Sequence, residues 1–311
     1  MAENHLNTSF EFRSHFPRNE SYIDYLAKLR WPNGWVCPRC QAVKARRVRR
    51  HRWLCAHCRY ETSVTAGTIF QDSHLALETW FRAIWEITVG KEGMSALTLQ
   101  RRLKLNSNRT AWILLHKLRQ AMVPTELDRL SGVVEVDVIH RKREQTPVKG
   151  QWIAENVVIA IAAEADRAEA GRVWVQTVPD LTRTSLHVFI AAAVAPGSTV
   201  RTDGSHLYQK LRGYTHQCQT YDERNPRQEK LQHVQAIIKE LNSWMLRLYP
   251  GGVSTKYLND YLNEFTFHFN PRGDLSKWER FDRLARQAAQ IKPTPYARLE
   301  KPQPVRTRGV N

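Results

Sequence analysis

The chain has 311 residues, enough for two or three domains, and its hydrophobic fraction of 42% can support sizeable cores. Its net charge of +17, from 47 Lys and Arg against 30 Asp and Glu, favours a polyanionic partner because neutralising phosphates releases counterions. The sequence has no apolar run of about 18 residues, and its start lacks the pattern of a secretory signal. We therefore expect no membrane partner and a cytoplasmic location, in association with nucleoid DNA.

The first part of the chain is expected to be helical around one cysteine-rich segment. Helical spacing of apolar residues predicts a helix over 20–30, ended by Pro32 and Gly34. Short strands are expected over 35–62. Three helices are predicted after them, over about 75–89, 94–104 and 107–122, with Ser95 and Asn108 as N-caps of the second and third.

The pattern then changes to strands. The expected order is strand 133–139, strand 153–163, strand 172–178, helix 182–194, strand 199–203, a short strand 214–220, and helices 228–248 and 254–268. The end of the chain, from Arg286 onward, is rich in Lys, Arg and Pro and is predicted to be a mobile basic arm.

Four of the five cysteines form two Cys-x2-Cys pairs, Cys37/Cys40 and Cys55/Cys58, separated by 14 residues. In a cytosolic chain this spacing indicates metal binding and not disulfides. Four thiolates on two tight turns suit a closed tetrahedral Zn²⁺ site, whose binding would supply the folding free energy of so small a segment. His57, between two of the ligands, is a minor alternative donor, and four reduced structural cysteines are the other interpretation.

Positive charge is concentrated in the same segment. From Cys37 to Arg59 the chain carries eight Lys and Arg and no Asp or Glu, which predicts a surface that contacts phosphates. A solvated basic hairpin would look the same. We take Arg46, Arg47, Arg49 and Arg50 as the candidate DNA-binding residues of this hairpin.

Helices 94–104 and 107–122 suggest a helix-turn-helix, in which a short helix, a turn and a basic second helix follow one another. Arg109, Lys117 and Arg119 are the side chains expected to reach DNA. A plain helical bundle would give a similar pattern, and Trp80, Trp85 and Trp112 are expected to be core residues.

Two aspartates are candidate metal ligands in the predicted strands of the second part of the chain. Asp137 lies on the first strand of the second part and Asp203 ends the fourth, and an unpaired carboxylate among apolar strand residues is costly. The order of strands and helix is that of the RNase H fold, which brings these two positions together. Divalent cations such as Mg²⁺ would stabilise the pair and serve phosphoryl transfer. The alternative is that each Asp merely ends a strand or caps a turn.

Several segments together resemble bacterial insertion-sequence transposases of the ISXO type, which have an N-terminal zinc ribbon and an RNase H-like DDE domain. They are Arg30-Trp-Pro-Asn-Gly-Trp-Val-Cys-Pro-Arg-Cys40, Ser63-Val-Thr-Ala-Gly-Thr-Ile-Phe70, Met94-Ser-Ala-Leu-Thr-Leu-Gln100, Ala111-Trp112, Val134-Glu-Val-Asp137, Ala195-Pro-Gly-Ser-Thr-Val-Arg-Thr-Asp-Gly204 and Tyr257-Leu-Asn-Asp-Tyr-Leu-Asn-Glu-Phe-Thr-Phe-His-Phe-Asn-Pro-Arg272. The resemblance covers about residues 15–272. It implies Mg²⁺-dependent cleavage and transfer of DNA strands at transposon ends, with Asp137 and Asp203 as catalytic metal ligands.

The third catalytic position departs from the resemblance. The family places Glu, Asn or His there and a Lys seven residues later, whereas alignment on Trp244 puts Gln235 and Asn242 at these places. A slipped alignment offers His233 with Lys239, and Glu240 is a further candidate. Val138 also stands where the family usually has Glu, so the catalysis is expected to be weakened or lost.

The sequence thus predicts an α+β multidomain protein. The expected domains are 1–66, an N-terminal helix and zinc ribbon; 67–125, a helix-turn-helix segment; 130–272, an RNase H-like mixed α/β catalytic domain; and 273–311, a basic tail. We expect a DDE-type transposase that binds double-stranded DNA as a homodimer or higher oligomer. The alternatives are a transposase-derived DNA-binding protein that no longer cuts and a structure-selective nuclease. Cys218 is expected to be a buried thiol, and His140 and Arg141–Arg143 are weaker candidates for contacts to DNA.

Overall fold

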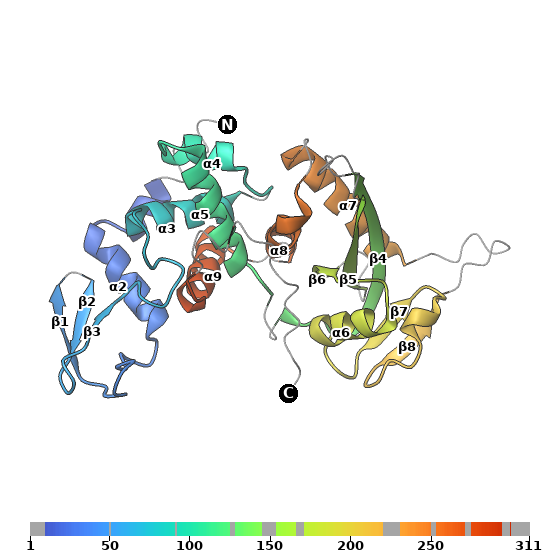
Figure 1. The fold of residues 1–311 in the computed structure, drawn as a ribbon, viewed down its shortest axis with the longest axis horizontal. Helices are drawn as coiled ribbons and strands as arrows, with labels where there is room; N and C mark the ends of the chain where they lie inside the picture. Colours follow the sequence, from blue (N-terminus) through green and yellow to red (C-terminus); the bar gives the residue numbers. More distant parts are fainter. Residues whose placement is uncertain are drawn as a thin grey trace. The chain divides into compact units, whose positions relative to one another are not determined.

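The structure of the protein is a computed structural model that describes residues 10–49, 51–90, 92–124, 128–144, 154–165, 171–219, 231–249, 253–270, 275–293 and 299. The chain forms two compact units (Figure 1). The first comprises Met1–Met122 and Gly273–Glu300, and the second comprises Val123–Arg272 and Lys301–Asn311.

The first unit combines a small sheet with a group of helices. Its elements are α2 (Asn19–Arg30), β1 (Ala45–Arg49), β2 (Arg52–Cys55), β3 (Glu61–Ser63), α3 (Leu77–Val89), α4 (Ala96–Leu103), α5 (Asn108–Ala121) and α9 (Lys277–Gln290). The three strands pair antiparallel in the order β1-β2-β3. Helix α2 ends before Gly34, whose φ of 94° favours glycine. Ser95 caps α4 as expected, whereas Ser107 and not Asn108 caps α5.

An aromatic cluster forms the core of this unit. Phe12 from the first helical residues and Phe16 just after them pack with Phe81 and Trp85 of α3 and with Phe281 of α9, at ring-centroid distances of 5.2–6.2 Å. All five are nearly or fully buried. Segments far apart in the sequence therefore share one core.

Helix α9 corrects the expectation of a basic tail over 273–311 for residues 277–290, while most of the rest of that range, and of the mobile arm expected from Arg286 onward, lies outside the described residues. Its buried residues, Phe281, Leu284, Ala285, Ala288 and Ala289, recur at helical spacing and pack toward α2, α3 and α5. Arg286, the basic residue of the expected arm that lies within this helix, is exposed, and Ser276 with Glu279 forms a capping box at the start. The helix completes the first unit from the other end of the chain.

The second unit is built on a five-stranded mixed sheet. Its strands are β4 (Val133–Glu144), β5 (Ala154–Glu164), β6 (Val173–Val178), β7 (Thr199–Thr202) and β8 (Thr215–Cys218), in the order β6-β5-β4-β7-β8. Strands β4, β5 and β6 pair antiparallel, while β7 runs parallel to both β4 and β8. The strand predicted over 133–139 is longer than expected, because β4 continues through Glu144.

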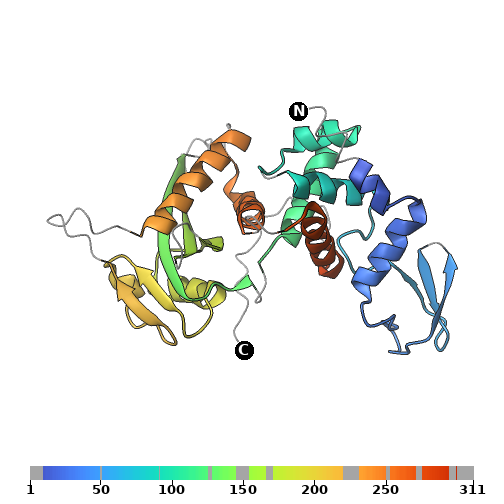
Figure 2. The same cartoon turned by 180° about the vertical axis from the view of Figure 1, so that it is seen from behind.

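Helices cover both faces of this sheet (Figure 2). Helix α6 (Arg183–Ala193) packs on one face with Val134, Val136 and Val200. Helices α7 (Gln232–Leu248) and α8 (Leu258–Phe269) pack on the other with Ile159, Ile161 and Val175. Because side chains alternate along a strand, the odd-numbered residues of β4, Glu135 and Asp137 among them, share the face toward α7.

Two asparagines, one within α8 and one at its end, close the edge of the sheet at β6. Asn270 accepts a hydrogen bond from the Val173 backbone N–H and donates one to its carbonyl, at 2.8 and 3.0 Å. Asn259 accepts one from the Thr177 N–H at 2.9 Å. The exposed backbone of an edge strand is thereby satisfied within the unit. No helix among the described residues has the length and apolar character that a membrane span requires.

Candidate metal centres and nucleic-acid interface

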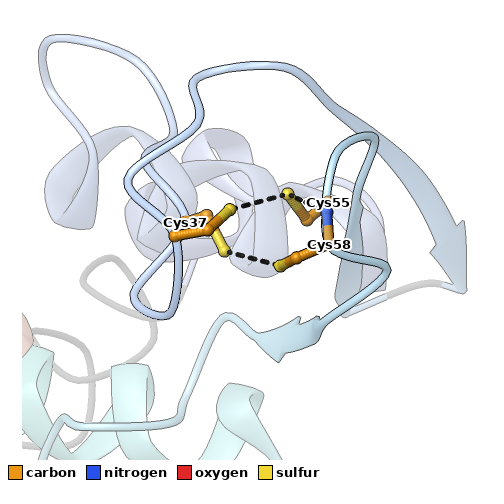
Figure 3. Close-up of side chains that lie close together, drawn as sticks. Cys37, Cys55 and Cys58 are labelled. Carbon is orange, nitrogen blue, oxygen red and sulfur yellow. Dashed lines mark hydrogen bonds between the residues drawn. The ribbon is translucent and has the colours of Figure 1, made fainter.

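The four cysteines of the two Cys-x2-Cys pairs converge. Figure 3 shows the side chains of Cys37, Cys55 and Cys58 pointing toward one another. The sulfur atoms of Cys37 and Cys58 lie 3.6 Å apart, as do those of Cys40 and Cys55, and all four lie within 4.8 Å of one another. Four sulfurs around a tetrahedral Zn²⁺ at about 2.3 Å would be roughly 3.8 Å apart, so the cluster fits a structural zinc ion.

The local backbone favours the thiolate form that a zinc ligand needs. The Cys58 N–H points at the Cys55 sulfur at 3.5 Å, and this contact is the largest of those that lower the pKa of the Cys55 thiol to about 6. His57 is exposed and is not part of the cluster. The cysteine site is therefore the one that sequence spacing predicted, without the alternative donor.

The arginines of the hairpin differ in whether their side chains contact other residues of the protein. Arg46 and Arg49 are exposed on β1. Arg47 instead pairs with Asp24 of α2 at 2.7 Å and lies over the ring of Trp53, 5.4 Å from its centroid. Arg50 lies outside the described residues. Arg46 and Arg49 are thus better placed than Arg47 for phosphate contacts.

Of the basic residues predicted on α5, only Arg109 is exposed. Lys117 is half-buried, with its ammonium 5.9 Å from the centroid of the Trp80 ring, and burial lowers the pKa of this lysine. Arg119 is 1% exposed and donates to the Met94 carbonyl at 2.8 Å, so the expectation that it reaches DNA is wrong. Trp80 and Trp85 are buried in the core as expected, and Trp112 is half-buried.

Asp137 and Asp203 lie on neighbouring strands. The parallel register pairs Val133 with Thr199 and Glu135 with Arg201, and the same register, continued by two residues, brings Asp137 level with Asp203 just past the end of β7. Adjacent strands are about 4.8 Å apart. The expectation that the two aspartates stand side by side on adjacent strands agrees with this register.

The electrostatics of Asp137 reflect this placement. Burial raises the pKa of its carboxyl group above the usual value, and the negative charge of Asp203 raises it further. The Gln235 amide nitrogen of α7 donates to Asp137 Oδ2 at 2.6 Å, and the Val138 N–H donates to Oδ1 at 2.7 Å. The residue aligned with the third catalytic position therefore contacts the first aspartate.

The alternatives for the third position lie elsewhere on α7. The His233 ring faces Glu135, with Nδ1 2.9 Å from Oε1, and does not provide the contact to Asp137 that Gln235 makes. Glu240 is exposed, and Asn242 lies about two turns beyond Gln235. Glu135 is a buried residue that the sequence analysis missed. Strand alternation was the available signal, because Glu135 stands two residues before Asp137 and thus on the same face.

Asp137, Asp203 and Gln235 form a second candidate site, whose chemistry fits a divalent cation. Two carboxylates and an amide offer the oxygen ligands that Mg²⁺ prefers. A bound cation would also relieve the repulsion by which Asp203 raises the Asp137 pKa. Among the residues that the structure describes, however, the cysteines form the only group of three or more Cys, His, Asp or Glu with closely gathered ligand atoms. Within that described part of the chain, the aspartates have no third acidic or imidazole ligand at such close range.

The weaker candidates from the sequence lie near the surface of the second unit. Cys218 is exposed on β8 and its Sγ lies 3.4 Å from the Asp203 carbonyl, so the expectation of a buried thiol is wrong. His216 lies 2.8 Å from the Thr202 hydroxyl, and His140 is exposed.

Both candidate sites lie within segments that match known protein families. Residues 17–61 match the transposase zinc-ribbon domain, and residues 129–270 match the ISXO2-like transposase domain. The chain is also 25% identical, over 205 residues, to a protein of the transposable element ISH50 from Halobacterium salinarum. That alignment covers 60% of this chain and 67% of the relative. The cysteine cluster lies inside the first match, and Asp137 and Asp203 lie inside the second, so the chain carries a transposase zinc-ribbon domain and an ISXO2-like transposase domain.

Proposed function

We propose that the protein binds the inverted-repeat ends of an insertion sequence and catalyses metal-dependent cleavage and transfer of the DNA strands. The second unit acts as an RNase H-like catalytic domain, and the protein works on two element ends as a homodimer or higher oligomer. The observation that carries this proposal is the hydrogen bond from Gln235 of α7 to Asp137, together with the register of β4 and β7 and the charge interaction of Asp203 with Asp137, within a matched transposase domain.

In this proposal Asp137 and Asp203 hold Mg²⁺, and Gln235 occupies the third position. When bound, divalent cations supply a Lewis acid for the scissile phosphate and lower the pKa of the attacking hydroxyl. The protein's own contribution is to fix the two carboxylates on neighbouring strands, Asp137 within β4 and Asp203 just past the end of β7, and to keep Asp137 partly shielded from water, which strengthens its attraction for a cation. Asp203 is exposed, so a DNA backbone can reach it from solvent.

DNA binding is proposed to rest on the first unit. The exposed Arg46 and Arg49 of the zinc-ribbon hairpin contact phosphates, and α4 and α5, joined by the four residues 104–107, act as a helix-turn-helix with Arg109 exposed on the second helix. This assignment leaves out Lys117 because its ammonium lies over Trp80.

The test is cleavage of a DNA duplex that carries the terminal repeats found beside the gene, with Mg²⁺ or Mn²⁺. We expect nicking at the repeat end that Asp203→Ala abolishes. The matched control is Asp180→Ala, because Asp180 is an exposed aspartate that accepts hydrogen bonds from Thr182 and Ser185 at the start of α6. Cleavage that survives Asp203→Ala would refute the catalytic assignment. Specific repeat binding without any cleavage would instead favour a transposase-derived DNA-binding protein.

A further inference from the structure

Helix α7 begins without a cap of its own. Its N-cap residue, Leu231, provides no side-chain hydrogen bond, so the first backbone N–H groups of the helix need other acceptors. They find them on strand β4, where Glu135 Oε2 accepts from the His233 N–H at 2.8 Å and from the Val234 N–H at 3.0 Å. The cap thus comes from a residue almost a hundred positions earlier in the chain.

This carboxylate is only 3% exposed, and three donors surround it. Besides the two backbone groups, the His233 ring places Nδ1 2.9 Å from Oε1, where an ionised carboxylate can only accept. The positive end of the helix dipole stabilises the same charge. A buried carboxylate would be costly without these partners, so the contacts hold the first turn of α7 firmly against β4.

The anchored turn is the one that carries residue 235. Gln235 follows His233 by two residues and meets Asp137, which follows Glu135 by two residues on the same face of β4. Two carboxylates on one face of β4 therefore contact the first turn of α7, Glu135 through the backbone N–H groups of residues 233 and 234 and Asp137 through the Gln235 side chain. The contacts of Glu135 fix the start of α7 on β4, and the hydrogen bond of Gln235 joins the helix to Asp137.

We propose that Glu135 is a positioning residue for the carboxylate site: it holds the N-terminus of α7 on β4 so that residue 235 stays within reach of Asp137 and its bound cation. This inference rests on the proposed function, since it assigns Glu135 a role in the geometry of the same metal site. Glu135 itself binds no metal in this assignment, because both of its oxygens are taken by α7.

The experiment compares Glu135→Gln with a cap variant on the other face of the sheet. Glu135→Gln keeps the size of the side chain but replaces one accepting oxygen with a donor. Thr182→Ala is the matched control, because the Thr182 side chain caps α6 through the Ser185 N–H in the same unit. His233→Ala serves as a second, milder variant that removes only the ring from the cluster.

Two quantities are measured on the zinc-loaded full chain, well below its unfolding temperature. The first is hydrogen exchange of peptides that cover 231–240, and the second is Mn²⁺ affinity by calorimetry, with Asp203→Ala identifying the binding that belongs to this site. Glu135→Gln should speed exchange at the start of α7 and weaken Mn²⁺ binding about tenfold, the lower end of the effect typical for partners of metal ligands. His233→Ala should give a smaller change in the same direction, and Thr182→Ala should leave both quantities unchanged.

Each outcome bears on one of the two proposals. Unchanged exchange in Glu135→Gln would show that the carboxylate does not hold the helix. Faster exchange with unchanged Mn²⁺ affinity would show that the helix anchor does not serve the metal site. Either result overturns the role of Glu135 while the proposed transposase activity stands. Equal Mn²⁺ binding by wild type and Asp203→Ala would overturn the carboxylate site itself, and the positioning role with it.

Discussion

Glu135 and Asp137 show how neighbouring carboxylates on one strand face acquire different tasks. Glu135 is surrounded by donors from α7, so its charge is satisfied within the protein. Burial of the Asp137 carboxyl group and the negative charge of Asp203 both disfavour ionisation of Asp137 and raise its pKa. A carboxylate whose charge is unfavourable in the folded protein is one that a cation can stabilise, which is the physical basis for assigning metal binding to Asp137.

Asp137→Asn should therefore make the metal-free protein more stable at neutral pH. Because the folded pKa of Asp137 is raised, the native state holds its proton more tightly than the unfolded chain, and the free energy of unfolding falls as pH rises from the ordinary aspartate range through the raised pKa. The asparagine avoids this loss, and each 1 kcal/mol gained raises Tm by about 2–4 °C in a unit of this size.

Thermal unfolding as a function of pH checks this prediction. The difference in Tm between variant and wild type should be present at neutral pH without divalent ions and should disappear in acid below the ordinary aspartate pKa, where both side chains are neutral. A variant that is less stable than wild type at neutral pH would show that the Asp137 charge is already satisfied by Gln235 and Val138.

Gln235→Glu should strengthen the metal site. A neutral amide that donates to Asp137 becomes a third carboxylate, which repels Asp137 without a cation and attracts one when it is present. We expect lower stability without metal, tighter Mn²⁺ binding and faster cleavage of the repeat duplex. The gain should be about tenfold or more, which corresponds to roughly 1.4 kcal/mol. The matched control is Gln232→Glu, the same charge change at an exposed position of α7, which should leave cleavage unchanged. Equal effects of the two substitutions would contradict the placement of residue 235 in the site.

At the scale of elements, the zinc ribbon depends on its cysteines for stability. The three strands are only three to five residues long, too little to bury a core of their own, although Trp31 and Trp53 pack edge to face at 5.0 Å. We expect about one zinc per chain, lost in Cys37→Ser/Cys40→Ser and retained in Cys218→Ser, which alters a free thiol of the second unit. Elemental analysis after purification without added metal measures this. Zinc retained in the double variant would refute the site.

Most elements followed from local pattern, and the exceptions have identifiable causes. The Cys-x2-Cys spacing and the alternation around Asp137 are local signals, so the ribbon and β4 were predictable. Helix α9 was missed although Phe281, Leu284 and Ala288 recur at helical spacing, because net charge and nearby prolines dominated the interpretation. The choice among Gln235, His233 and Glu240 could not be made from the sequence, since it depends on the rotation of α7 against β4, which the remote Glu135 sets.

At the scale of the whole molecule, the net charge of +17 predicts DNA binding that weakens steeply with salt. The logarithm of the association constant falls linearly with the logarithm of the salt concentration. In Arg46→Gln/Arg49→Gln this fall should become less steep, by about 0.9 for each phosphate that is no longer neutralised. Lys117→Gln removes one positive charge as well, but its ammonium lies over Trp80, so the slope should not change. Fluorescence anisotropy with a repeat-end duplex provides the measurement. An unchanged slope in the double variant would mean that the hairpin faces away from DNA.

The first unit is completed by the end of the chain, so its stability should depend on a residue beyond the transposase domain. Phe281 is fully buried among Phe12, Phe16, Phe81 and Trp85, and Phe281→Ala should cost about 3–5 kcal/mol, a large share of the roughly 5–15 kcal/mol that holds a typical domain together. Hydrogen exchange should then rise in α2, α3 and α9, while peptides from β4, β5 and β7 keep their protection, because these neighbours of Phe281 all belong to the first unit. Phe10→Ala is the matched control, since the Phe10 side chain is 77% exposed in the same unit. Equal loss of protection in both units would contradict their division, and no loss in α3 would contradict the shared aromatic core.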